Sequence, residues 1–169
     1  MEYAYRAEAW QALYTAVAGS AAALTGLLFV ALSLNLRTIL TRPEHRARAR
    51  ETFGGLLSLM VLSLLLLIPG QDRRVLGVEL MVGSLVLMLG AVRLQFQTLR
   101  TMAFERRVRW VLRLVIFNLG TATALVAGMS LVAGLFGGLF WLVPTVLISL
   151  LWSLNNAWLL VAQVAKEGA

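Results

Sequence analysis

Long apolar runs alternate along this chain with short segments that are charged or rich in turn-forming residues. A helix needs about 20 apolar residues to cross the hydrocarbon core of a bilayer, and the apolar runs approach or exceed that length. They predict five transmembrane helices, at about residues 12–36, 53–68, 75–96, 110–133 and 139–162. The expected fold is therefore all-α: a single transmembrane helical domain that occupies residues 1–169.

The ends of the runs carry residues typical of membrane interfaces and turns. Trp10 precedes the first run and Arg37 follows it, as expected for aromatic and basic residues at the headgroup level. Pro43 predicts a helix break, and Pro69 with Gly70 predicts a turn after the second run. The second run is the shortest, so a re-entrant hairpin is an alternative to a full crossing.

Composition agrees with this assignment. Hydrophobic residues make up 60% of the chain and charged residues 14%, with a mean hydropathy of +0.82. Soluble domains are only about 45–50% apolar. The first residues lack a basic segment, and no cleavage pattern of small residues follows the first run. We therefore interpret that run as a retained helix and not as a removed signal peptide.

The positive charge predicts the orientation. With residues 37–51, 97–109 and the C-terminus inside, twelve of the 15 Lys and Arg residues lie on the cytoplasmic side, if Arg93 and Arg113 at the inner helix ends are included. Three (Arg6, Arg73 and Arg74) lie outside. The positive-inside bias then places the N-terminus outside and the C-terminus in the cytoplasm. Anionic lipid headgroups account for the net charge of +7 better than nucleic acid does, so membrane lipids are expected partners and nucleic acid is not.

Two spans carry small residues at helical spacing. Such rows let helix backbones approach closely, which drives association in lipid. For the row in the first span, two interpretations are open: packing against another span of the same chain, and self-association of copies. The rows are Ala12, Ala16, Gly19, Ala23 and Gly26 in the first span, and Gly120, Ala124 and Gly128 in the fourth.

Polar side chains form one face of the fifth span. Thr145, Ser149, Ser153 and Asn156 lie on that face, and Asn155 lies beside it. The hydroxyls could bond to their own helix, whereas amides in hydrocarbon need partners. Asn118 and Asn155 fall at similar depth, about 12 Å from the cytoplasmic ends, which predicts a hydrogen bond between them. Two interpretations of these polar side chains are open: a structural clamp between helices, and the lining of a polar pathway.

Glu79 is the one acidic residue inside a predicted span, close to Arg73 and Arg74. An interfacial ion pair is one interpretation, and a cation or proton site is the other. His45 is the single histidine and lies in a basic segment, so no metal site is predicted.

The residue inventory does not fit an enzyme. The chain has no cysteine and one histidine, and no span carries paired aspartates or a zinc-binding histidine pair. A phosphate-binding glycine loop is also missing. No catalytic residues, cofactors or metals are expected.

Residues 16–35, AVAGSAAALTGLLFVALSLN, resemble a stretch in a family of small bacterial multi-pass membrane proteins without assigned activity. The resemblance implies the fold class and a location in a bacterial inner membrane, and it brings no functional site. A second similarity links Ala23, Leu24, Thr25, Gly26 and Val30 to the pore helix of store-operated calcium channels. Leu34 stands where that family has its filter glutamate, so calcium selectivity is not implied.

Two function classes follow. The first is a non-enzymatic structural or regulatory membrane component that acts through helix–helix contacts with itself or with another membrane protein. The second is a homo-oligomeric passive ion channel or small-solute pore, lined by the first-span row or by the polar face of the fifth span. The sequence leaves the permeant species, the partner and the stoichiometry undetermined.

Overall fold

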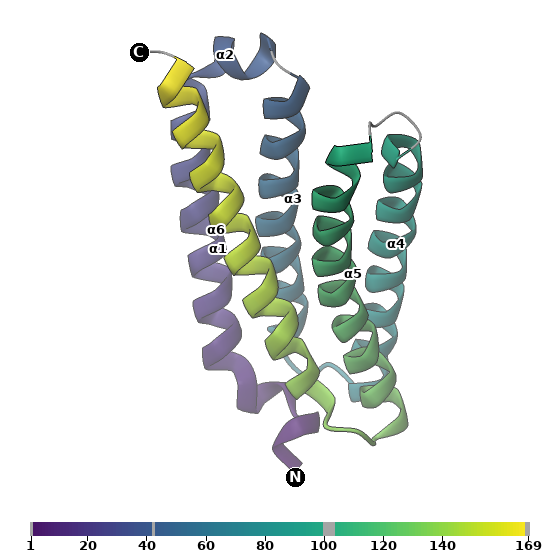
Figure 1. Cartoon of the computed structure of the whole chain (residues 1–169). Helices are drawn as coiled ribbons and strands as arrows, with labels where there is room; N and C mark the ends of the chain where they lie inside the picture. Colours follow the sequence, from purple (N-terminus) through teal and green to yellow (C-terminus); the bar gives the residue numbers. More distant parts are fainter. Residues whose placement is uncertain (1, 42, 100–103, 168–169) are drawn as a thin grey trace. The chain divides into compact units, whose positions relative to one another are not determined.

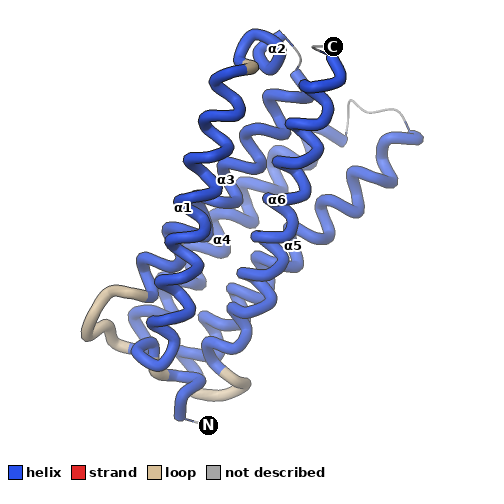
Figure 2. The backbone as a smooth tube through the Cα atoms, turned by 90° about the vertical axis from the view of Figure 1, so that its left-hand side faces the viewer, coloured by secondary structure: helices blue, strands red, loops and turns tan. Residues whose placement is uncertain are grey.

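The computed structural model describes residues 2–41, 43–99 and 104–167, and this part of the chain is helical with no strand (Figures 1 and 2). The all-α prediction is therefore confirmed. The α-helices are α1 Gln11–Leu34, α2 Leu36–Thr41, α3 Pro43–Leu66, α4 Arg73–Leu99, α5 Phe104–Ala133 and α6 Leu142–Glu167. Three short 3-10 helices accompany them: η1 Glu2–Tyr5, η2 Ala7–Trp10 and η3 Gly138–Trp141.

Four segments of the described residues are long and apolar enough to cross a membrane. They are Ala7–Leu34, Arg48–Leu66, Arg73–Arg93 and Gly138–Ala162. The fourth expected span, residues 110–133, falls on α5, a helix of 30 residues whose described apolar part, Asn118–Ala133, is shorter. Most side chains of α5 before Asn118 lie outside the described residues.

The basic connection after the first span is helical, contrary to the expected loop. Residues 37–51 contribute most of α2 and the first turns of α3. Arginine is a good helix former, and Pro43 occupies the first position of α3, where its missing N–H costs nothing. The helix therefore starts ten residues before the expected span. It is continuous for 24 residues, about 36 Å, and so it is not a re-entrant hairpin.

Local signals set the other boundaries. The Asp72 Oδ1 accepts a hydrogen bond of 2.7 Å from the Arg74 N–H, which caps α4. Asn35 interrupts the helix between α1 and α2, and its side chain donates to the Ala31 carbonyl. These are short polar side chains that bond to nearby backbone, as helix termini require.

The chain forms two compact units. The first unit comprises Met1–Trp10 and Ile68–Ile148, and the second comprises Gln11–Leu67 and Ser149–Ala169. In the first unit α4 and α5 lie side by side, and η1 packs on η3 (Figure 1). In the second unit α1 packs on α3 around a core that α6 joins, formed by Leu28, Leu32, Ile39, Ala49, Leu56 and Leu160. The α6 helix begins in the first unit and ends in the second.

Candidate functional site

The N-terminal segment packs on the turn that connects α5 to η3. The Tyr5 hydroxyl accepts a hydrogen bond of 3.1 Å from the Gly137 N–H. The Trp10 and Phe140 rings meet edge to face, with centroids 4.7 Å apart, a favourable aromatic geometry. The guanidinium of Arg73 lies 5.6 Å from the centre of the Tyr5 ring. These contacts hold the N-terminal segment against the rest of the first unit, residues 68–148.

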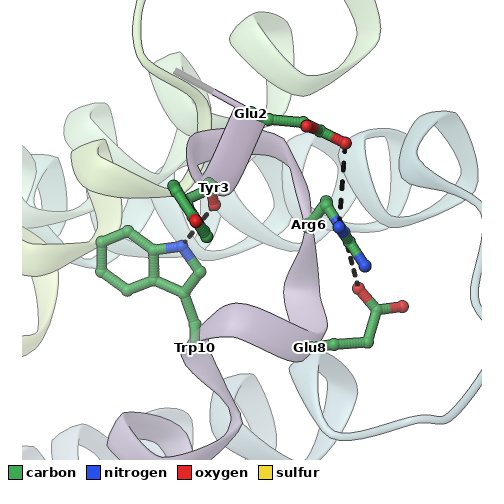
Figure 3. Close-up of polar contacts among 5 residues, drawn as sticks. All are labelled: Glu2, Tyr3, Arg6, Glu8 and Trp10. Carbon is green, nitrogen blue, oxygen red and sulfur yellow. Dashed lines mark hydrogen bonds and ion pairs between the residues drawn. The ribbon is translucent and has the colours of Figure 1, made fainter.

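Polar contacts within the N-terminal segment are mostly at its surface. The Trp10 indole N–H donates to the Tyr3 carbonyl at 2.8 Å (Figure 3). The Arg6 guanidinium lies between Glu2 and Glu8, at 3.7 and 4.0 Å from their carboxylates (Figure 3). All three side chains are exposed, and ion pairs of this kind add little stability.

Ser130 organises the turn after α5. Its hydroxyl donates to the Leu135 carbonyl and accepts a hydrogen bond of 2.8 Å from the Gly138 N–H. Four residues of the turn have positive φ angles: Gly134, Phe136, Gly137 and Gly138. The three glycines adopt this region without steric cost. Sequence reasoning found the turn but missed Ser130. A serine in the last turn of a helix, just before a glycine-rich segment, is the available signal.

The Glu79 carboxylate has a different partner from the one expected. Its Oε2 accepts a hydrogen bond from the Gln71 amide at 2.5 Å. Within the described residues it forms no ion pair with Arg73 or Arg74, because Arg73 turns toward Tyr5 and Gly134. The predicted ion pair is therefore wrong. The cation or proton site at Glu79 remains a prediction.

Thr145 links the start of α6 to α5. Its hydroxyl lies 2.8 Å from the Thr123 hydroxyl and 3.2 Å from the Gly120 carbonyl. A longer contact, 3.4 Å, joins the same hydroxyl to the carbonyl of Trp141 at the end of η3. The threonine is buried. In the first unit this side chain therefore acts as an interhelical clamp.

The small row of α5 lies at the contact with α4. Gly120, Ala124 and Gly128 are all buried. A Cβ atom on Gly128 would stand 2.7 Å from the Gly77 carbonyl oxygen. The two helices therefore meet backbone to backbone at these glycines, the kind of close approach that small residues permit.

The polar face of α6 continues into the second unit. Ser153 and Asn156 are each 1% exposed, Ser149 is half-buried and Asn155 is exposed. The Ser153 hydroxyl is directed at α3, 2.7 Å from where a Cβ on Gly55 would stand. Asn118 belongs to the first unit and Asn155 to the second. The hydrogen bond predicted between them stays a prediction.

The small row of α1 faces outward. Ala12, Ala16, Gly19, Ala23 and Gly26 are all exposed, and no atom lies within 4 Å of a Cβ built on Gly19 or Gly26. The buried residues of α1 are Tyr14, Val17, Ala21, Leu28 and Leu32. At about 100° per residue these point nearly opposite to the small row. Within the second unit the row therefore packs on no described helix. Packing of the row against a span of the first unit and self-association of copies both stay predictions.

The described residues contain no group of three or more His, Asp or Glu side chains that could hold a metal ion. Comparison of the chain with protein-family models, with curated proteins and with solved structures finds no match.

Proposed function

We propose that this chain is an integral membrane protein of five transmembrane helices, with its N-terminus outside and its C-terminus in the cytoplasm of a bacterium. Four apolar segments of spanning length and the 30-residue α5 support this assignment. Large apolar side chains are exposed on these helices, among them Leu27 at 69% and Leu151 at 67%. In water such surfaces promote association and aggregation, whereas hydrocarbon solvates them.

The proposed role is non-enzymatic: the protein acts through lateral helix–helix contacts as a homo-oligomer or with another membrane protein. The observation that carries this proposal is the outward orientation of the α1 row. Lipid chains are as apolar as leucine, so a row of small residues gains nothing from facing lipid. The row gains van der Waals contact when another helix backbone packs on it.

Fluorescence transfer between labelled copies in liposomes tests the proposal. Replacing both Gly19 and Gly26 with leucine fills the open row, and we expect about a tenfold loss of association, which corresponds to about 1.4 kcal/mol. The matched control is leucine at Gly83 and Gly90 of α4, which are also exposed with open space around them. If the α1 variant associates as strongly as the wild type, or if the α4 control loses as much association as the α1 variant, the α1 row has no specific role in association.

A passive pore is the second candidate, and Asn155 favours it. Its amide is exposed on a membrane-spanning segment, and no described residue forms a hydrogen bond with it. A polar group in hydrocarbon needs water or a partner, and a water-filled path between copies supplies both. Ion flux from liposomes tests this function: flux that falls in Asn155→Leu supports the pore, and no flux above empty liposomes from a demonstrated oligomer rejects it.

A further inference from the structure

An apolar groove runs along the second unit where α1, α3 and α6 meet. Its volume is about 310 Å³, at the lower end of the roughly 300–1,000 Å³ of small-molecule sites. It is lined by α1 between Leu24 and Ala31, by Leu56 of α3, and by α6 between Ser153 and Val161. All of these lining side chains except Ser153 are apolar.

Size differences among the lining residues create the groove. Leu28 and Leu56 are buried and form its floor. Ala31 and Ala157 leave the space that larger side chains would fill, and Trp158, 71% exposed, forms one wall. The α6 part of the lining is about 12 Å long. The groove is therefore long and narrow, and it opens on the side of the unit.

Two exposed arginines lie beyond one end of this groove. Arg46 and Arg50 are exposed near the N-terminal end of α3, and neither forms an ion pair with a described residue. Arg50 precedes the groove residue Leu56 by six positions, about 9 Å along the helix. The α2 helix and the C-terminal end of α6 lie at this same end of the unit (Figure 1). An exposed acidic residue, Glu51, also lies here but has a partner of its own.

Charge complementarity identifies the occupant. Arg50 and Arg46 precede the groove residue Leu56 by about 9 and 15 Å along the α3 axis. An apolar groove with two exposed arginines beyond one end matches a molecule with an apolar chain attached to an anionic head. Cytoplasmic leaflets present anionic lipids, and arginines near that surface attract them. Arginine also suits phosphate better than lysine does, because its planar fork donates two parallel hydrogen bonds.

We propose that the groove holds one acyl chain of an anionic phospholipid, whose phosphate is bound by Arg46 and Arg50. The proposal relies on the membrane location proposed above, but not on association through the α1 row, because the groove and the row lie on different sides of α1. The lipid is a bound ligand of one subunit, distinct from the bulk bilayer around it.

Native mass spectrometry of the full chain, released from mixed micelles, tests the site. The probes are phosphatidylglycerol and phosphatidylcholine, which differ in headgroup charge. We expect phosphatidylglycerol to be retained selectively. We expect its retention to fall about tenfold or more in the double variant Arg46→Gln, Arg50→Gln. The control is Arg74→Gln, an exposed arginine of the first unit.

Filling the groove tests the acyl-chain contact separately. Ala157→Phe should lower retention of both lipids, and Ala31→Phe gives the same test from α1 if the first variant does not fold. The control is Ala22→Phe, an exposed α1 position outside the groove. Equal retention of the two lipids by the wild type, or unchanged retention in the folded groove variants, would overturn the proposal.

The same spectra separate the two proposals. Monomers that retain phosphatidylglycerol selectively would overturn association and leave the lipid site intact. Oligomers that retain the two lipids equally would overturn the lipid site and leave the association proposal intact.

Discussion

Gly77 of α4 and Gly128 of α5 meet backbone to backbone. A Cβ on Gly77 would lie 2.9 Å from the Gly128 carbonyl oxygen, and a Cβ on Gly128 would lie 2.7 Å from the Gly77 carbonyl oxygen. Since real Cβ atoms do not come so close to backbone oxygens, the absence of both side chains sets the separation of these two helices.

The first prediction concerns this contact. Gly77→Ala and Gly128→Ala should each destabilise the protein by about 1–3 kcal/mol, because the added methyl group overpacks a backbone contact. Unfolding by denaturing detergent measures the loss. Gly90→Ala on α4 is the control: its Cβ meets open space, and alanine should stabilise that helix by up to about 1 kcal/mol. Similar stabilities for all three variants would contradict the role of the glycine contact.

The second prediction concerns the packing of the N-terminal segment on the turn before η3. Gly138 combines a φ of +53° with a position where a Cβ would collide with the Ala4 carbonyl oxygen. Gly138→Ala should therefore release the N-terminal segment and increase hydrogen exchange of residues 2–10. Gly70 has a similar φ of +70° but open space around it. Gly70→Ala should cost only about 1 kcal/mol of backbone strain and leave exchange at the N-terminus unchanged.

The third prediction concerns the Thr145 clamp. A double-mutant cycle with Thr145→Val and Thr123→Val should give a coupling of about 0.6–2 kcal/mol, the range of hydrogen bonds between membrane helices. Thr25 is the control, because its hydroxyl donates to the Ala21 carbonyl of its own helix. Replacing Thr25 with valine should show no coupling to Thr145. A coupling near zero between Thr123 and Thr145 would argue against the clamp.

The fourth prediction contrasts two buried serines. The Ser130 hydroxyl has two partners, whereas the buried Ser153 hydroxyl forms no hydrogen bond with the part of the chain that the structure describes. Ser130→Ala should cost about 1–3 kcal/mol, since it leaves the Gly138 N–H unpaired. Ser153→Ala should be neutral or stabilising, because it removes a buried hydroxyl that lacks a partner among the described residues. The same unfolding titration compares them, and a larger loss at Ser153 would contradict this assignment.

The sequence alone determined the helical elements. Continuous apolar runs, Pro43, Pro69 and the glycines from 134 to 138 placed the helices to within a few residues at most ends. These features act locally: proline removes a backbone donor, and glycine permits left-handed turns. The N-terminal start of α3 was missed because a basic segment predicts solvent contact and leaves its backbone conformation open.

The direction in which each helix faces was decided only by the tertiary structure. The small row of α1 and its buried face, which includes Tyr14 and Val17, are similarly apolar, so hydropathy does not separate them. In a soluble helix the polar side identifies the exposed face. In hydrocarbon both environments are apolar, and shape complementarity selects the face that packs. The contact of Tyr5 with Gly137 joins residues 132 positions apart, and no local pattern encodes such a pair.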